Sequence, residues 1–239
     1  MDFNSFKEEM EINLKALGLE LNDEQIKNFY DFMNILIEKN KVMNLTGITE
    51  PKEVILKHFI DSLTILKYIN KSDTVIDVGT GAGFPGLPLR ISDTSLKMTL
   101  LDSLNKRINF LNEVIEHTSL DKVNTIHGRA EDFGKNVEYR EKYDIATSRA
   151  VAPTNILLEY MMPFIKVGGK CICMKGGNCD EEIENAKNAI KILGGKIEKI
   201  EKFNLPNSDN NRTILVIKKV KKTDKQYPRN AGIPTKKPL

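Results

Sequence analysis

The segment TVIDVGTGAGFPG, residues 74–86, restricts the fold of this chain more than any other stretch. A run of Val and Ile of this length is typical of a buried strand in a parallel sheet. Glycines follow at positions 79, 81, 83 and 86. Glycines directly after such a strand let the chain turn tightly and bring its backbone against a nucleotide. The segment therefore predicts an open α/β sheet that binds an adenosine-like group at this turn.

Two classes of nucleotide cofactor are compatible with these glycines. The last three match the GxGxxG pattern of dinucleotide enzymes, in which a diphosphate lies at a helix N-terminus. Counted from Asp77, the segment reads DxGxGxG, which resembles the first motif of Rossmann-like S-adenosylmethionine-dependent methyltransferases. A diphosphate would need backbone N–H groups where Phe84 adds bulk and Pro85 removes a donor. The pattern therefore favours S-adenosylmethionine, which has no phosphate.

Asp102 supplies a second indication of nucleotide binding. It ends the apolar run 98–101 and lies 19 positions beyond Gly83. A ribose-binding carboxylate is expected at the tip of the second strand, about 20 residues past the glycines. The alternative is a helix cap, because an amphipathic helix is expected over about 103–117. Its apolar stripe comprises Leu104, Ile108, Leu111 and Ile115. Since open α/β sheets bind ligands at strand ends, we favour the ribose role.

The periodicity of apolar residues predicts a helical extension followed by an α/β domain. Residues 1–70 show helical spacing, with an N-cap at Asn22, and no strand pattern. Over 71–220 strands and helices alternate, which predicts a parallel doubly wound sheet. The expected parallel strands are 74–78, 97–101, 123–127, 143–147 and 170–175. The last two strand patterns, 196–205 and 213–220, are joined by a short turn and must be antiparallel. We therefore expect the Rossmann-like class I S-adenosylmethionine-dependent methyltransferase fold, a mostly parallel sheet with a C-terminal antiparallel hairpin.

Composition favours a cytoplasmic protein without a membrane segment. No run approaches the roughly 18 apolar residues needed to span a bilayer, and residues 1–18 lack a signal-peptide core. The three cysteines, Cys171, Cys173 and Cys179, are clustered, and the first two alternate along a strand pattern. Because no histidine or fourth cysteine lies nearby, they are better explained as small buried side chains than as metal ligands. We expect no metal.

The C-terminal segment, 221–239, belongs to a strongly basic end of the chain. From Arg212 onward there are nine Lys or Arg residues and one acid, Asp224, whereas the whole chain has a net charge of +3. For the lysine run 218–225 alone, a solubilising end explains the charge equally well. The final YPRNAGIPTKKPL adds an aromatic residue, a glycine and prolines, which predicts a fixed loop that grips RNA. The candidate RNA-binding residues are Tyr227, Arg229, Lys236 and Lys237, together with Lys106 and Arg107, for which a solvated helix face is an equal alternative.

Several separate segments carry a closer resemblance. They are NLT at 44–46, KHFIDSL at 57–63, DVGTGAGFPGLPL at 77–89, LDSLNKR at 101–107, GRAE at 128–131, YDIATSRAVA at 143–152 and YPRNAGIPTKKPL at 227–239. In this order they resemble the bacterial 16S ribosomal RNA methyltransferase G family, also called glucose-inhibited division protein B. Thr80 stands where many members have serine. The resemblance implies methyl transfer from S-adenosylmethionine to nitrogen 7 of a guanine in the 530 loop of 16S rRNA, free or in the small ribosomal subunit.

The resemblance also implies which residues contact the cofactor. They are Gly79, Phe84, Ala130, Glu131 and Arg149, with Asp102 as the ribose acid; the glycine pattern adds Gly81. Without the resemblance, Glu131 would be a solvated acid or a helix cap, and Arg149 a rim arginine paired with an acid. With it, we expect Arg149 to orient the guanine or the methionine carboxylate of the cofactor.

Nitrogen 7 of guanine has a free lone pair, so the implied reaction needs positioning and no general base. His58, Asp61 and Ser62 have the residue types of a hydrolytic triad, but they are spaced i, i+3 and i+4 on one expected helix. We expect them to fix the helical extension against the sheet or to touch RNA.

Two functions of other classes remain open at this stage. An NAD-dependent oxidoreductase would satisfy the GxGxxG match. This sequence, however, shows no recognisable hydride-transfer acid, and that class of enzyme would not explain the terminal hairpin. A non-enzymatic RNA-binding regulator would keep the basic tail and have no need for the glycine turn. For the enzyme we expect a monomer.

Overall fold

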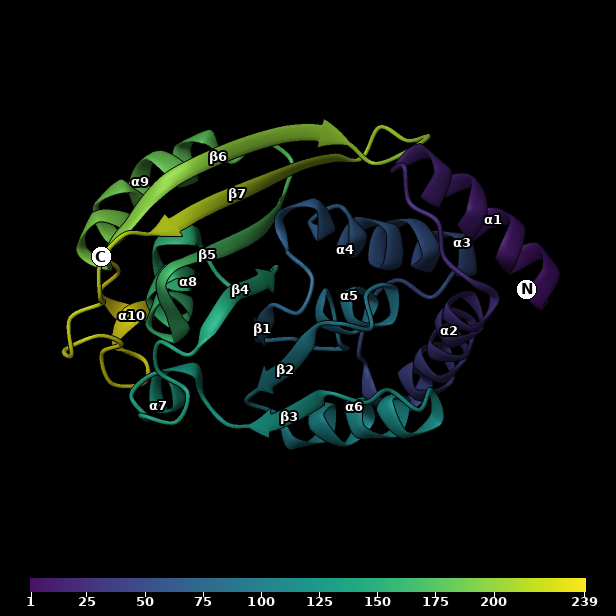
Figure 1. The fold of residues 1–239 in the computed structure, drawn as a ribbon, viewed down its shortest axis with the longest axis horizontal. Coiled ribbons are helices and arrows are strands. Elements are labelled where there is room, and N and C mark those ends of the chain that lie inside the picture. The colour runs from purple at the N-terminus through teal and green to yellow at the C-terminus, as the bar shows by residue number, and fades with distance from the viewer.

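The computed structural model describes residues 1–239, and its centre is a seven-stranded mixed sheet with helices on both faces (Figure 1). The strands are β1 (Thr74–Val78), β2 (Lys97–Asp102), β3 (Val123–His127), β4 (Tyr143–Arg149), β5 (Ile165–Gly176), β6 (Gly195–Asn204) and β7 (Asn211–Lys219). Their order is β3-β2-β1-β4-β5-β7-β6. The first five run parallel, and β7 is antiparallel to both β5 and β6. The expected topology, with its terminal hairpin, is confirmed.

Helices precede the sheet and cover its faces. The α-helices are α1 (Phe3–Ala16), α2 (Asp23–Met43), α3 (Pro51–Val54), α4 (Asp61–Leu63), α5 (Gly86–Ser92), α6 (Asn105–His117), α7 (Ala130–Phe133), α8 (Thr154–Met161), α9 (Asp180–Ile192) and α10 (Ile233–Lys236). A π-helix, η1 (Ile55–Ile60), connects α3 to α4, and short 3-10 turns lie at η2 (Leu66–Tyr68) and η3 (Met162–Phe164). No helix is long and apolar enough to cross a membrane.

The expected helix start at Asn22 is confirmed by a reciprocal cap. The Asn22 side chain accepts from the Gln25 backbone N–H at 2.9 Å, and the Gln25 side chain accepts from the Asn22 backbone N–H at 3.0 Å. This capping box satisfies donors that the first turn of α2 leaves without helical partners. Helix α2 lies against α5 and α6, and its buried residues belong to the core cluster that also includes residues of the sheet.

Residues 1–70 share one apolar core with the sheet. Phe59 of η1 lies 4.9 Å from Phe29 and 5.5 Å from Phe32, both on α2, measured between ring centroids. Phe32 in turn stacks on Phe84 at 5.2 Å, and Phe84 follows β1. This aromatic chain belongs to a continuous buried cluster that extends from α1 to β1, β4, β5 and β7. The extension is therefore packed directly behind the glycine turn.

Two local expectations need correction. Leu104 does not join the core: it is 43% exposed, because α6 begins one residue later and Leu104 lies before its first turn. Strand β5 begins at Ile165, earlier than expected, because Ile165 pairs with Tyr143 ahead of a register shift in β4. Strand β4 also continues to Arg149, two residues past its expected end.

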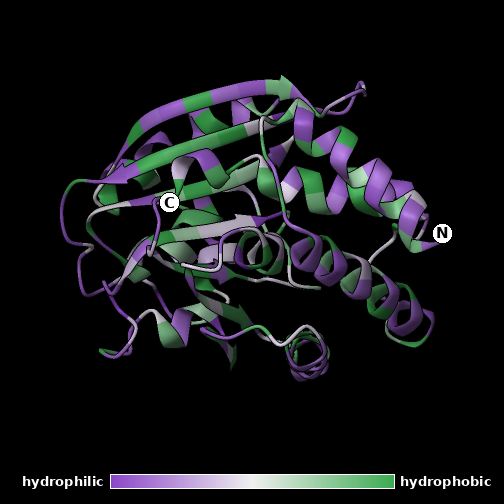
Figure 2. Cartoon of the chain, turned by 45° about the vertical axis from the view of Figure 1, so that its right-hand side comes forward, coloured by the Kyte–Doolittle hydropathy of each residue, from purple (hydrophilic) through white to green (hydrophobic).

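Hydropathy differs sharply across the terminal hairpin. Figure 2 shows the outer strand β6 as mostly hydrophilic and its inner neighbour β7 as mostly hydrophobic. Five of the ten residues of β6 are lysine or glutamate, and charged edge strands resist pairing with another chain.

Candidate active site

Two adjoining hollows lie at the carboxyl ends of β1, β2 and β4. The larger has a volume of about 680 Å³ and the smaller of about 290 Å³. Both are lined by Gly79, Asp102, Ser103 and Val151. Strand β1 lies between β2 and β4, so the order of the strands reverses here, and open α/β sheets bind ligands at such a reversal.

Within the glycine turn, Gly79 lines both hollows and Gly81 lines the larger one. Gly79 and Gly81 have φ values of +71° and +62°, in the left-handed region that favours glycine. A Cβ on Gly79 would lie 2.7 Å from Cγ2 of Val151, so the site admits no side chain there without movement. A Cβ on Gly81 would meet no atom within 4 Å. The backbone at Gly81 therefore faces open space, where a ligand can approach it closely.

Asp102 joins the glycine turn to the start of α6. Its Oδ2 accepts from the Gly81 backbone N–H at 2.9 Å and from Nη1 of Arg107 at 3.3 Å. Its Oδ1 accepts from the Leu104 backbone N–H at 2.9 Å. The carboxylate thus tethers the residues before α6 and also lines both hollows. Because Oδ1 has a single partner, it retains a lone pair for a ribose hydroxyl.

Asp77, on β1, supports the glycine turn through hydrogen bonds. From the sequence this residue only marked the start of the motif, and its supporting role was not predicted. Its Oδ2 accepts from the Thr80 hydroxyl at 2.7 Å and the Gly86 backbone N–H at 2.8 Å. Its Oδ1 is buried without a hydrogen-bond partner. Burial raises the pKa of Asp77 to about 7, against the lowering effect of these hydrogen bonds.

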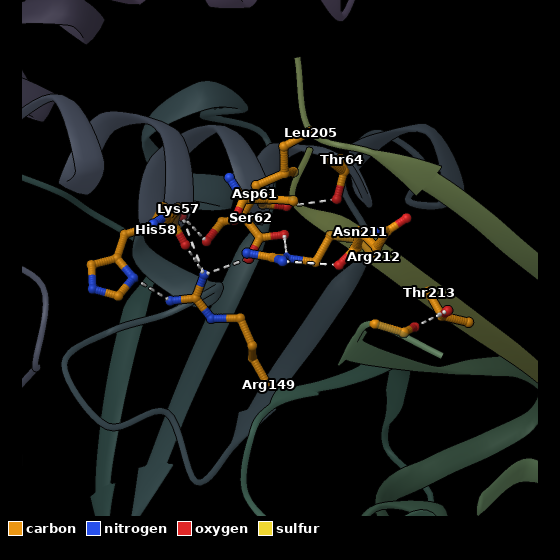
Figure 3. Close-up of polar contacts among 12 residues, drawn as sticks. Lys57, His58, Asp61, Ser62, Thr64, Arg149, Leu205, Asn211, Arg212 and Thr213 are labelled. Atoms are coloured by element: carbon orange, nitrogen blue, oxygen red, sulfur yellow. Dashed lines mark hydrogen bonds and ion pairs between the residues drawn. The ribbon is translucent and has the colours of Figure 1, made fainter. Parts of the chain in front are cut away.

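Arg149 links the helical extension to the sheet (Figure 3). Its Nη1 donates to Oδ2 of Asp61 at 3.2 Å and to the Lys57 carbonyl at 3.0 Å. Its guanidinium lies 4.9 Å from the ring centre of Phe84. Asp61 also accepts from Nε of Arg212 on β7 at 3.0 Å, so one buried carboxylate faces two guanidinium groups. Burial lowers the pKa of Arg149, and Asp61 opposes that shift.

His58 completes this network as a neutral ring. Its Nδ1 lies 3.0 Å from Nη2 of Arg149 and its Nε2 lies 2.8 Å from the Thr46 hydroxyl. Arginine can only donate, so Nδ1 accepts and Nε2 carries the proton. Burial and then the charge of Arg149 lower the pKa of His58 to about 3. The Ser62 hydroxyl donates to the His58 carbonyl at 2.6 Å and not to the ring, so these residues do not form a hydrolytic triad.

Helix α7 forms the far wall of the smaller hollow. Ala130 and Glu131, its first two residues, line this hollow together with Tyr160 of α8. Glu131 is buried, and its Oε1 accepts from the Gly232 backbone N–H at 3.4 Å, a long contact. The structure thus brings Gly79, Asp102, Ala130 and Glu131 around one hollow, and Phe84 and Arg149 line the larger one.

Comparison with known proteins decides the family. Residues 25–214 match the family described as rRNA small subunit methyltransferase G. The ribosomal RNA small subunit methyltransferase G of Acetivibrio thermocellus is 53% identical over 241 residues, which cover 97% of this chain and 99% of the relative. That of Alkaliphilus metalliredigens is 51% identical over 227 residues, which cover 94% and 95%. This chain belongs to the rRNA small subunit methyltransferase G family.

More distant solved structures agree on the fold of this chain. A SAM dependent methyltransferase from Aquifex aeolicus has a TM-score of 0.54 at 17% identity, covering 73% of this chain and 96% of its own. M. capricolum TrmK, solved with S-adenosyl-homocysteine, has a TM-score of 0.53 at 19% identity, covering 73% of both chains. At such identities the likeness concerns the fold alone.

The candidate RNA-binding residues of this chain lie in different environments. Lys236, Lys237 and Lys106 are exposed, and Tyr227 is half-buried against the core around α8 and α9. Arg107 faces Asp102, as described above. Arg229 is engaged within the chain, because its side chain donates to both oxygens of Glu159, at 2.6 Å to Oε2 and 2.9 Å to Oε1.

Three further basic residues line the larger hollow, and the sequence did not indicate them. They are Lys57, Lys175 and Arg212. Arg212 lies 151 positions from its partner Asp61, so no local pattern signals it. The clustered cysteines are buried as expected, with the sulfur atoms of Cys171 and Cys173 3.8 Å apart.

Proposed function

We propose that this member of the rRNA small subunit methyltransferase G family transfers a methyl group from S-adenosylmethionine to nitrogen 7 of a guanine in the 530 loop of 16S rRNA. Family membership supports S-adenosylmethionine-dependent methylation of ribosomal RNA and leaves the oxidoreductase and the non-enzymatic regulator without support. The observation that carries the proposal is the placement of Asp102, which lines both hollows beside the open backbone of Gly81.

The residues around the hollows fit S-adenosylmethionine. Asp102 would bind the ribose hydroxyls, for which its Oδ1 has acceptor capacity left. Gly79 and Gly81 would let the backbone approach the cofactor closely. Ala130 and Glu131 would flank the adenine from α7. The larger hollow, lined by Phe84 and Arg149, would hold the methionine part and receive the guanine.

S-adenosylmethionine, when bound, supplies an electrophilic methyl group on a sulfonium. The role of the protein is to orient the acceptor and exclude water, since nitrogen 7 needs no deprotonation. The lone pair of His58 Nδ1 is occupied by Arg149 and its pKa is about 3, so His58 is not a free base near neutral pH. Arg149, held in place by Asp61, is our candidate for orienting the guanine or the methionine carboxylate.

The RNA partner is proposed to meet the basic side chains around the site. Lys57, Arg107, Lys175 and Arg212 line the larger hollow, together with Arg149. Asp61 and Asp102 are the only acidic residues that line this hollow, so basic side chains outnumber acidic ones in its lining. Two of the basic residues also have acidic partners that do not line the hollow, because Lys57 pairs with Glu53 and Lys175 with Glu182. Such a surplus attracts the phosphates of an RNA. We propose that the protein works as a monomer in the cytoplasm on 16S rRNA or the small ribosomal subunit.

The test is methyl transfer from labelled S-adenosylmethionine to undermethylated small ribosomal subunits and to their naked RNA, followed by chemical cleavage at 7-methylguanine. One new cleavage in the 530 loop is the expected result, and the labelled species identifies the substrate. Incorporation of label without cleavage in that loop would refute the proposed target. A matched control is Gly79→Arg, whose side chain should block the cofactor hollow and abolish labelling.

A further inference from the structure

The C-terminal segment packs against the helices that wall the smaller hollow. In Figure 1 the yellow segment with α10 lies beside α7 and α8. Arg140 donates to the tail carbonyls of Thr223 at 2.7 Å and Tyr227 at 2.7 Å, and also to the Gly134 carbonyl at the end of α7 at 2.8 Å. Lys135, just past α7, donates to the side chain of Asn230 at 2.6 Å. The tail is therefore an ordered part of the domain, fastened next to α7.

The central contact of this segment is a buried ion pair. The Glu159 side chain is 1% exposed and lies on α8 beside the buried apolar residues Leu157, Leu158 and Met161. Every hydrogen bond that Glu159 accepts comes from Arg229: the backbone N–H at 2.8 Å and the guanidinium at 2.6 to 3.2 Å. A buried carboxylate without a partner is strongly unfavourable, so the packing of α8 depends on the tail.

Residues of α7 and α8 that line the smaller hollow also contact the C-terminal segment. Tyr160 follows Glu159 on α8 and lines the smaller hollow, and its hydroxyl lies 3.2 Å from the Thr235 hydroxyl of the tail. On α7, Glu131 lines the same hollow, and its nearest donor is the Gly232 backbone N–H of the tail. Tyr160 and Glu131 lie on different helices. The side-chain hydrogen bonds of both are made to the C-terminal segment.

We propose that Arg229 is a positioning residue of the cofactor site: by pairing with Glu159 it locks the C-terminal segment across α7 and α8 and holds Tyr160 and Glu131 in the wall of the hollow. The inference rests on the proposed binding of S-adenosylmethionine in this hollow. It assigns Arg229 to cofactor affinity, whereas the sequence pattern had placed it among RNA-binding residues.

The test compares Arg229→Ala with Lys225→Ala, which removes the same charge from an exposed residue of the same segment. Calorimetry with S-adenosylmethionine should give a dissociation constant raised about tenfold for Arg229→Ala and unchanged for Lys225→Ala. In steady-state assays the KM for S-adenosylmethionine should rise in Arg229→Ala, with the KM for the ribosomal substrate unaffected. Hydrogen exchange should accelerate over residues 128–134 and not in β1 or β4.

Three results would overturn the inference. Wild-type affinity for S-adenosylmethionine in Arg229→Ala would remove the positioning role alone. A loss of RNA affinity with unchanged cofactor affinity would return Arg229 to the RNA-binding set. Wild-type protein that fails to bind S-adenosylmethionine would remove the proposed function and the inference together. If Arg229→Ala does not fold, Arg229→Lys carries the test: it keeps the charge but loses the two-pronged contact, so it should show a smaller rise in the same constant.

Discussion

Asp102 combines a structural and a functional position. It accepts three hydrogen bonds that connect β2, the glycine turn and α6, and it faces the space where we place the ribose. Asp102 is not the N-cap of α6: that position is Leu104, and no side chain caps the helix there. The Oδ1 of Asp102 instead accepts from the Leu104 N–H ahead of the helix, and this local structural contact is compatible with a ribose role for the same side chain. The structural contacts also hold the carboxylate in place before a ligand arrives, which lowers the entropic cost of binding.

Asp102→Asn tests the ribose role. The amide keeps the shape but offers one acceptor oxygen in place of two and no charge. Hydrogen bonds to a charged group contribute about 1.5–3 kcal/mol, so the dissociation constant of S-adenosylmethionine should rise roughly 10- to 100-fold. Calorimetry measures it. Asp132→Asn, at an exposed acid on α7, is the control and should bind normally; equal affinities in the two variants would argue against a ribose contact.

Arg149→Lys tests orientation by the guanidinium. Lysine keeps the charge but cannot hold Asp61, the Lys57 carbonyl and His58 at once. Misplacement of an orienting group by about 1 Å can cost about 100-fold in rate, so we expect a fall in kcat of that order. Single-turnover methyl transfer at saturating S-adenosylmethionine measures it. An unchanged rate together with unchanged cofactor affinity would remove this role.

His58 should make stability depend on pH. Its folded pKa of about 3 lies below the ordinary 6.5, so the unfolded chain binds a proton first as the pH falls. Its contribution is therefore fully present above pH 6.5 and declines between pH 6.5 and 3. At pH 5 the loss should be about 2 kcal/mol. In urea unfolding, the stability at pH 7 minus the stability at pH 5 should be lower by about 2 kcal/mol in His58→Gln than in the wild type.

Asp77 should change the stability with pH in the opposite direction to His58, so its variant is the control for the His58 experiment. Its folded pKa of about 7 lies above the ordinary 3.8, so ionisation between these values destabilises the fold as the pH rises. Asp77→Asn should therefore make the stability at pH 7 minus that at pH 5 more positive than in the wild type, whereas His58→Gln makes the same difference more negative. Changes of the same sign in both variants would contradict this assignment.

At the scale of elements, the π-helix η1 is the junction between the extension and the site. It carries Phe59 into the aromatic core and His58 toward Arg149, and it ends directly before Asp61. Single π turns within helices occur frequently at functional sites. Apolar periodicity predicts a helix here, but it does not distinguish a π turn from a regular α turn.

Phe59→Ala should destabilise the protein strongly. The ring is fully buried and lies within 6.4 Å of Phe6, Phe29, Phe32 and Phe84, measured between centroids. Losing a buried Phe costs about 3–5 kcal/mol. Phe3→Ala, at a partly exposed ring with an edge contact to Tyr30, should cost about 1 kcal/mol. Urea titration measures both, and similar losses would mean that Phe59 is not a central core residue.

At the scale of the whole molecule, charge is distributed unevenly. The N-terminal helices and the basic C-terminal segment lie at opposite ends of the structure in Figure 1. Part of the tail charge is used internally by Arg229, whereas Lys236 and Lys237 remain exposed. The free charges are therefore available to a polyanion, and the ordered loop gives them a defined position.

The double variant Lys236→Ala/Lys237→Ala should bind 16S rRNA with weaker salt dependence. Each lost phosphate contact lowers the slope of log affinity against log salt by about 0.7–0.9, so a decrease of roughly 1.5 is expected. Filter binding across a salt series measures the slope. Lys15→Ala, at an exposed lysine on α1, should leave it unchanged. An unaltered slope in the double variant would place the RNA elsewhere.

The sequence alone was sufficient for the mostly parallel sheet, the terminal antiparallel hairpin, the Asn22 cap and the location of Asp102 at a strand end. These depend on short-range signals: apolar periodicity, glycines directly after a strand, and the spacing between successive strand ends. The positive φ angles of Gly79 and Gly81 follow from the same local pattern. Such features are encoded within a few residues, so they can be inferred before any packing is known.

Only the tertiary structure decided which side chains meet. Arg149 contacts Asp61 across 88 positions, and Arg229 contacts Glu159 across 70. From sequence, Arg229 could be grouped with RNA-binding lysines because its charge was visible and its partner was not. Helix packing sets these contacts, because it determines which buried acid lies within reach of which guanidinium. A buried carboxylate must then take the partner that the fold presents.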